Sequence, residues 1–294
     1  MKGNPLVECV PNFSEGRDRS IIVALETAAA SVPGASLLDT STDVDHNRTV
    51  LTIAGAPEPL AEAVFRAVAV AVERISLSNH EGVHPRVGAA DVVPFVPVED
   101  ASLFDCAEIA VRVGERLWNE LSLPVFLYEA AARSPARTRL EIIRSPSFRG
   151  EPDFGLGRHP TAGAAIVGAR RFLIAWNVNL ESTDVIAART IARAIRESSG
   201  GLPCVKALGL PLSSRGRVQV SINLTDFSTT PLCLVFKKVQ EEAHKLGTHV
   251  SGSELIGLIP KAALEASAEC DFQWEMPSPI DDYVLETRLA KLRR

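Results

Sequence analysis

The stretch TVLTIAGAPEPLAEAVFRAVAVAVERI, residues 49–75, holds the pattern from which the fold of this chain can be predicted. Residues 49–54 are mostly β-branched and apolar, which favours a strand. Gly55-Ala56-Pro57 breaks that strand, and proline is well tolerated in the first turn of a helix. The apolar residues that follow recur at helical spacing: Leu60, Val64, Val68, Val72 and Ile75. We therefore expect a strand that leads directly into a helix with one apolar face.

The flanking segments extend this strand and helix into a larger unit. Residues 6–13 predict a strand, residues 17–32 a helix and residues 35–41 a second strand. After the helix, the valine-rich residues 91–98 predict a further strand. The order is β-α-β-β-α-β, which is typical of the ferredoxin-like, split-βαβ arrangement.

The second half of the chain repeats this order. The repeat contains four predicted strands and two predicted helices: strands 172–179, 203–212, 217–224 and 250–260, and helices 184–196 and 234–245. A further helix is expected at 262–270. We predict an α+β protein of two ferredoxin-like (β-α-β-β-α-β) subdomains joined by a linker, with helices packed on one face of each sheet. The expected division is 1–178 and 179–294.

The region between the two units has a different character. Residues 103–121 are amphipathic and helical, and residues 125–127 are strand-like. Residues 134–158 are rich in Arg, Ser, Pro and Gly and have little periodicity. A long irregular segment inside a compact protein is more often a functional loop or lid than a passive connection.

Composition limits the classes of partner. The chain has 294 residues, of which 46% are hydrophobic and 23% charged, and a formal charge of -5. No global basic field is available for nucleic acid or an anionic membrane, so we expect neither partner. The apolar tract at 61–75 is too short and too charged to span a bilayer. The five cysteines are scattered and form no C-x-x-C pair, which predicts reduced thiols and a cytoplasmic location.

The turn NHEGVHPRVG, residues 79–88, concentrates candidate chemistry. It holds two of the six histidines and lies between the predicted helix and strand. Residues 80–84 also spell H-E-x-x-H, so a zinc hydrolase that uses His80, Glu81 and His84 is one interpretation. That motif needs a continuous helix, whereas glycine costs about 1 kcal/mol in a helix and a residue before proline prefers extended geometry. Gly82 and Pro85 therefore oppose the zinc interpretation, and no metal is expected.

Two other interpretations of His84 remain open from the residues. It could be a half-buried histidine that only supports a tight turn. It could also be a general acid/base, because neutral imidazole, with an unperturbed pKa of about 6.5, takes and gives protons near neutrality.

Four ordered blocks of sequence resemble the glutamate formiminotransferase family. The blocks are VECVPNFSEG (7–16), NRTV (47–50), HPRVGA (84–89) with Asp91 and Pro94-Phe95, and PDFG (152–155) with residues 163–179. The match runs from residue 6 to about residue 260, and four blocks in order are far more specific than any one alone. The resemblance is to the stand-alone transferase without the cyclodeaminase domain.

The resemblance implies transfer of the formimino group from N-formimino-L-glutamate to the co-substrate tetrahydrofolate, giving 5-formiminotetrahydrofolate and L-glutamate. It implies that His84 is the acid/base, that no metal takes part and that the protein is a homodimer. The folate-binding residues it implies are Gly155, Leu156, Gly157, Arg158, His159, Pro160, Thr161, Ala162 and Gly163. The residues expected to bind substrate are Asn47, Arg48 and Arg86, with Arg158 as a further candidate for a carboxylate. A folate-binding protein without turnover is the remaining alternative.

This chain departs from the animal relatives near the expected site. Residues 134–151 are fewer than in those proteins, and Ser41 stands where they carry an acidic residue. The sequence therefore leaves four candidates for the carboxylate that supports His84: Asp39, Asp43, Asp45 and Asp91.

Overall fold

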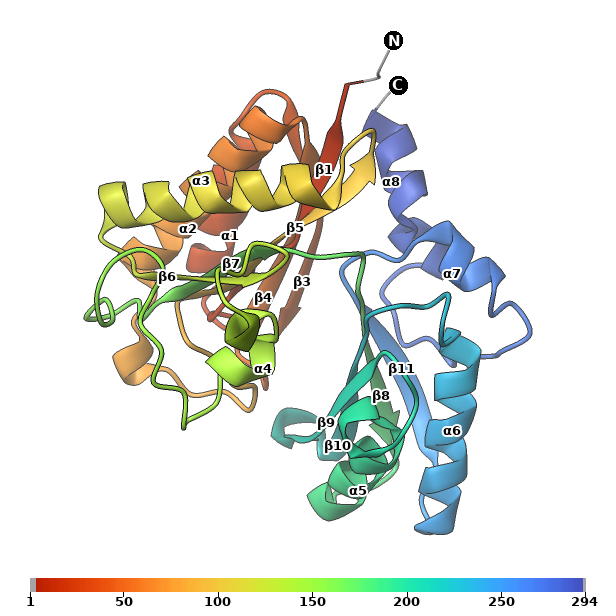
Figure 1. Ribbon diagram of the computed structural model, residues 1–294. Coiled ribbons are helices and arrows are strands. Elements are labelled where there is room, and N and C mark those ends of the chain that lie inside the picture. Colours follow the sequence, from red (N-terminus) through yellow and green to blue (C-terminus); the bar gives the residue numbers. More distant parts are fainter. Residues whose placement is uncertain (1–3, 293–294) are drawn as a thin grey trace. The chain divides into compact units, whose positions relative to one another are not determined.

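The computed structural model describes residues 4–292 and divides into two compact units, Met1–Arg171 and Phe172–Arg294 (Figure 1). The predicted division at 178/179 falls inside the first strand of the second unit. Residues 174–178 belong with the second unit because that strand pairs with two others there. Within the described residues, no helix has the length and apolar character needed to cross a membrane.

The first unit contains the predicted β-α-β-β-α-β order followed by four further helices and strands. Its strands are β1 (Leu6–Cys9), β2 (Asn12–Phe13), β3 (Ala35–Asp43), β4 (Arg48–Gly55), β5 (Ala90–Glu99), β6 (Val125–Glu129) and β7 (Ala165–Ala169). Its helices are α1 (Arg19–Ala30), α2 (Pro57–Arg74), α3 (Leu103–Leu121) and the one-turn α4 (Leu140–Ile143). The ferredoxin-like part has β5 beside β1 and β2, then β4, then β3, all antiparallel. The predicted fold class is confirmed.

Two details of this sheet were not predicted. The expected strand at 6–13 is divided into β1 and β2 at Pro11, a residue without the N–H that a ladder requires. Strand β7 was missed, because a short apolar run beside a glycine-rich segment carries little periodicity. It lies between β5 and β6, parallel to both, and is buried along its length. Buried parallel strands of this kind lack the alternation that marks exposed ones.

The main core of the first unit lies between the sheet and helices α1, α2 and α3 (Figure 1). The apolar face predicted for α2 is confirmed, since Leu60, Val64 and Val68 are fully buried. Part of the opposite face of the sheet carries a smaller cluster that includes Phe126 and Ile166. Ile143 of α4 packs in this cluster, so the segment after α4 is held over that face.

The second unit is a four-stranded antiparallel sheet with helices. Its elements are β8 (Ile174–Leu180), α5 (Val185–Ile195), β9 (Val205–Leu212), β10 (Arg217–Leu224), α6 (Leu232–Lys245), β11 (Val250–Ile256), α7 (Lys261–Glu265) and α8 (Leu285–Leu292). The strand order β11-β8-β10-β9 matches that of the ferredoxin-like part of the first unit. The predicted repeat is therefore present in the topology of the two sheets.

The prediction of reduced thiols is wrong for one pair of cysteines. Cys233 of α6 and Cys270 form a disulfide with their Cα atoms 5.6 Å apart. The two residues are 37 positions apart in sequence, and the chain returns to α6 only after β11 and α7. Spacing along the chain does not reveal such a contact. Cys9, Cys106 and Cys204 are free thiols.

Candidate active site

The turn that carries His80 and His84 is not helical. A one-turn 3-10 segment, Leu77–Asn79, ends before it, and His80 is extended with φ -95° and ψ 126°. The two imidazoles consequently do not have the helical i, i+4 relation that a zinc-protease motif needs. His80 Nε2 also lies 2.6 Å from Arg86 Nη1, a cationic neighbour that disfavours a metal at this nitrogen.

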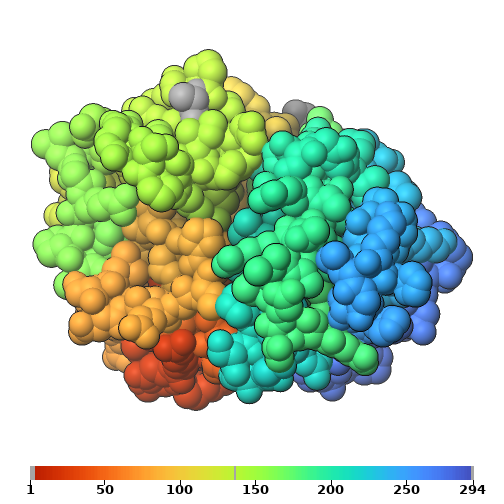
Figure 2. Space-filling view, turned by 90° about the horizontal axis from the view of Figure 1, so that it is seen from below, coloured from red at the N-terminus to blue at the C-terminus, as the bar shows by residue number. Residues whose placement is uncertain are grey.

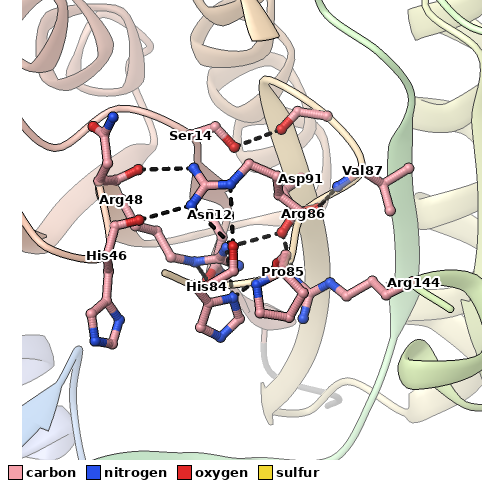
Figure 3. A network of polar contacts seen from close by, with 12 residues as sticks. Asn12, Ser14, His46, Arg48, His84, Pro85, Arg86, Val87, Asp91 and Arg144 are labelled. Carbon is pink, nitrogen blue, oxygen red and sulfur yellow. Dashed lines mark hydrogen bonds and ion pairs between the residues drawn. The ribbon is translucent and has the colours of Figure 1, made fainter. Parts of the chain in front are cut away.

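His84 is half-buried, and its Nδ1 lies 2.9 Å from the carbonyl oxygen of Pro85 (Figure 3). A carbonyl oxygen only accepts hydrogen bonds, so this contact, shorter than the 3.4 Å approach of Arg48 Nη1 to the same nitrogen, favours the tautomer of the neutral ring with its proton on Nδ1. The Nε2 atom then carries the lone pair and has no hydrogen-bond partner within residues 4–292. Arg48 Nη1 lies 3.4 Å from Nδ1, so a guanidinium group is the nearest charged neighbour on that side.

Asp91 reaches this site through a β-bulge. Asn12 pairs with Val92, whereas Phe13 pairs with Ala90, so Asp91 is the additional residue of β5. A bulge interrupts the alternation of side chains and can redirect one of them. Asp91 Oδ1 accepts a hydrogen bond of 2.7 Å from the Val87 amide, which connects the bulge to the turn.

Asp91 is the centre of a buried ion network. Its Oδ2 accepts from Arg48 Nη1 at 3.0 Å and from Arg144 Nη2 at 2.5 Å, and the three side chains are 0%, 9% and 12% exposed respectively (Figure 3). Burial acts to raise the pKa of Asp91, but the guanidinium groups of Arg144 and Arg48 outweigh it and lower the pKa to about 2. Burial lowers the pKa of Arg48 to about 10, so it remains a cation at neutral pH.

The same neighbours hold His84 in its neutral form. Burial lowers the pKa of His84 well below 6.5, and the positive charges of Arg48 and Arg144 lower it further. The ring is therefore neutral at neutral pH, and the lone pair of Nε2 is available to accept a proton.

Arg86 is used to hold the turn. Its Nε and Nη2 donate to the His84 carbonyl at 3.2 and 3.0 Å, and Nη2 also donates to the His46 carbonyl at 2.8 Å. Nη1 donates to the Asn47 carbonyl at 3.1 Å and to His80 Nε2 at 2.6 Å. All five N–H groups of this guanidinium thus have protein acceptors. In this geometry none is left over for a substrate carboxylate.

Through its side chain, Asn47 connects the loop that carries Gly16 to the turn that carries Glu81. Its side chain accepts from the Gly16 amide and donates to the Glu81 carbonyl, each at 2.9 Å. Its φ of 46° is left-handed, a conformation that asparagine tolerates better than most residues. Among the candidate carboxylates, Asp39 accepts from Ser41, and Asp43 accepts from the amide of His46. Asp91 is bonded to Arg48.

The glycine-rich segment 155–163 lies against the His84 turn. Its last residues form a tight turn in which His159 and Gly163 exchange two backbone hydrogen bonds. Gly163 bridges to Gly88, and the Ala89 amide donates to the Ala162 carbonyl at 2.8 Å. In Figure 2 the orange surface around residue 80 borders the green surface of this loop. Leu156 is 79% exposed, and Arg158 Nη1 lies 3.4 Å from the Val87 carbonyl.

Gly163 is expected to be intolerant of a side chain. Its φ is +71°, and an added Cβ would lie 2.3 Å from the Val87 carbonyl oxygen. Gly157 has a φ of +61° but open space around its missing Cβ, so it is a matched control for backbone strain. We expect Gly157→Ala to lose about 1–2 kcal/mol of unfolding free energy in urea, and Gly163→Ala to lose at least ~1 kcal/mol more. Equal losses would show that the Gly163–Val87 contact is not tight.

Arg144 is the residue of this network that sequence reasoning missed. It lies in the segment identified as irregular and arginine-rich, where nothing in its local pattern distinguishes it from Arg139 or Arg149. Its position follows from Ile143, which packs on the sheet and turns Arg144 towards Asp91. The nearest sequence signal is an apolar pair, Ile142 and Ile143, inside a polar loop.

No grouping of three or more His, Cys, Asp or Glu side chains suited to a metal occurs in the part of the chain that the structure describes. The charges that surround His84 are mainly guanidinium groups. Such a site matches anions, since guanidinium pairs with carboxylates in a two-pronged geometry.

Fold and sequence matches together define the chain as a transferase built of two subdomains. It belongs to the formiminotransferase family: the "Formiminotransferase domain, N-terminal subdomain" matches residues 6–170, and the "Formiminotransferase domain" matches residues 175–282. The resemblance drawn from the four sequence blocks is confirmed by these matches.

Individual relatives agree with this assignment. A glutamate formimidoyltransferase of Streptococcus pyogenes serotype M1 is 43% identical over 281 residues, 92% of this chain and 94% of that protein. One of Thermoplasma acidophilum is 42% identical over 88% of this chain and 89% of that protein. The formimidoyltransferase-cyclodeaminase of Mus musculus is 43% identical over 90% of this chain, which corresponds to 52% of the longer mouse protein.

Proposed function

We propose that this protein transfers the formimino group of N-formimino-L-glutamate to tetrahydrofolate, with His84 as the general acid/base. The formimino group is an amidine. The N5 amine of tetrahydrofolate attacks its carbon and gives a tetrahedral intermediate. Collapse of that intermediate expels the nitrogen of glutamate and leaves 5-formiminotetrahydrofolate and L-glutamate.

The proton balance of this reaction suits one imidazole. The attacking nitrogen loses a proton as the new C–N bond forms, and the leaving nitrogen gains one as the old C–N bond breaks. His84 takes the first proton on Nε2 and returns it to the leaving nitrogen, a form of catalysis worth about 10² to 10⁴ in rate. Holding the two substrates together lowers the barrier by up to ~7–11 kcal/mol more.

The observation that carries the proposal is the state of His84. A neutral ring with Nδ1 bound to the Pro85 carbonyl presents Nε2 as a base, and the cations around it suit substrates that carry glutamate carboxylates. Asn47 and Arg86 support this site through the loops they hold, as their hydrogen bonds suggest.

Segment 155–163 is proposed to receive tetrahydrofolate. Support comes from its place beside the His84 turn and from its glycines, which allow a flat ring to approach the backbone closely. The homodimer that the resemblance implies and the cytoplasmic location expected from the cysteine pattern stay predictions.

The test is a transfer assay with protein treated with a chelator and both substrates present. We expect one 5-formiminotetrahydrofolate and one L-glutamate per turnover, with a rate that the chelator does not change. Tight binding of tetrahydrofolate without glutamate release would favour the folate-binding alternative. Loss of activity on chelation, restored by zinc, would favour the hydrolase alternative.

The pH dependence of kcat/KM is expected to reveal the lowered pKa of His84. Activity needs the neutral ring, so it should persist as the pH falls through 6.5 and be lost only below the depressed pKa. In Arg144→Met, one of the two charges that depress this pKa is gone, so the acidic limb should move to higher pH. The kcat/KM values are measured from pH 4 to 9, with each substrate limiting in turn and the other saturating. A limb at or above pH 6.5 in the wild type would contradict the prediction.

A further inference from the structure

Arg144 and Arg48 share a single carboxylate oxygen, Oδ2 of Asp91. Two guanidinium groups therefore face one carboxylate, and the other oxygen of that carboxylate is occupied by the Val87 amide. The three side chains carry a net charge of +1 in a place where none is more than 12% exposed. An uncompensated buried charge is costly, so this arrangement favours the arrival of an anion.

Arg144 also has unused hydrogen-bonding capacity. Its Nη2 is bonded to Asp91, whereas its Nε is buried and has no hydrogen-bond partner among the described residues. A buried donor without an acceptor costs about 1–3 kcal/mol, and a ligand that accepts from it recovers that cost. Arg86 differs in this respect, because protein acceptors take all five of its N–H groups.

We infer that Arg144, together with Arg48, binds the α-carboxylate of the formimino donor. This inference rests on the proposed function and adds to it the residue that selects a donor with a carboxylate next to the reacting nitrogen. Arg144 thereby takes the carboxylate-binding role for which Arg86 has no free N–H group.

Proximity to His84 favours the α-carboxylate over the side-chain carboxylate. Arg48 Nη1 lies 3.4 Å from His84 Nδ1, so an anion bound by Arg48 and Arg144 is close to the imidazole. In formiminoglutamate the α-carboxylate is attached to the same carbon as the leaving nitrogen. The side-chain carboxylate is separated from that carbon by two methylene groups. An α-carboxylate at Arg48 and Arg144 therefore brings the leaving nitrogen to the ring that must protonate it.

The experiment compares two donors on three variants. Formiminoglycine keeps the α-carboxylate of formiminoglutamate but lacks its side-chain carboxylate. The variants are Arg144→Met, Arg144→Lys and the control Arg139→Met, an arginine of the same segment that is 57% exposed and paired with Glu141. Steady-state kinetics with saturating tetrahydrofolate give kcat and KM for each donor. Urea unfolding verifies that each variant is folded.

We expect Arg144→Met to lower kcat/KM about 50-fold for both donors, mainly through KM, because one charge-assisted pair is lost in each case. Arg144→Lys should recover part of the loss, since it keeps the charge without the planar fork. Arg139→Met should stay within about twofold of the wild type, as expected for an exposed pair.

Three results would overturn the inference. A loss confined to formiminoglutamate would assign Arg144 to the side-chain carboxylate instead. A change of less than twofold for both donors would leave Arg144 as a counter-charge for Asp91 alone. If the wild type transfers no formimino group, the proposed function fails, and calorimetric titration with L-glutamate then decides on the subsite: no binding, or equal binding by Arg144→Met, would overturn it.

Discussion

Replacing His84 with alanine is expected to lower kcat by about 10² to 10⁴-fold, the range that a positioned proton carrier contributes. The half-buried ring contacts the Pro85 carbonyl at 2.9 Å and Arg48 Nη1 at 3.4 Å, and within residues 4–292 it has no ion pair with a carboxylate, so the fold should survive its removal. The KM for tetrahydrofolate should change little, because the glycine-rich segment and not the imidazole is proposed to hold it. Stopped-flow measurement of product formation with both substrates saturating checks this result.

Two further variants make the His84 result specific. His84→Gln keeps a polar side chain that cannot take a proton near neutrality, so it should be as slow as the alanine variant. His244→Ala removes an exposed histidine of α6 and should match the wild type. A His84→Ala protein that retains more than a third of the wild-type kcat would contradict the role assigned to the ring.

Replacing Asp91 with asparagine is expected to cost about 3–5 kcal/mol of unfolding free energy, the effect of removing one partner from a buried ion network. The new side chain has the same shape but leaves Arg48 and Arg144 facing each other without a counter-charge. Its oxygen can still accept from the Val87 amide, so the loss reports mainly the missing charge. Urea denaturation at pH 7 measures the difference.

The control for Asp91→Asn is Glu141→Gln, which neutralises a carboxylate that pairs with Arg139 at the surface. That pair is 57% and 42% exposed, and its removal should cost less than about 1 kcal/mol. The Asp91→Asn protein should also lose most of its transfer activity, because Arg48 and Arg144 would no longer be held beside His84. An equal effect of the two substitutions would contradict the account of the network.

Local periodicity explains why the fold class could be predicted. The apolar face of α2 and the β-branched, apolar runs of the strands are short-range patterns, and similar patterns recur in both halves of the chain. Strand β7 and the Cys233–Cys270 disulfide depend on contacts between distant segments. Neither leaves a periodic signal in the sequence, so the first was missed and the second was predicted wrongly.

The candidate site, like the fold, could be predicted only in part from the sequence. His84 could be identified from the composition of its turn, and Asp91 was one of four candidate carboxylates. The choice of Asp91 depends on the bulge opposite Asn12 and Phe13, which strand pairing alone reveals. The five bonds of Arg86 go mainly to backbone carbonyls, which every residue possesses, so its structural use has no sequence signature. Arg144 stands among similar arginines, and nothing in the sequence around it indicates its contact with Asp91.

The protonation state of the His84 ring in solution tests the central claim most directly. The ¹⁵N chemical shifts of its two ring nitrogens can be followed through a pH titration, with His84→Ala used to assign the signals. We predict a neutral ring at pH 7 with the proton on Nδ1, and a pKa below 6.5. A ring that is protonated at pH 7, or a neutral ring with its proton on Nε2, would contradict the account.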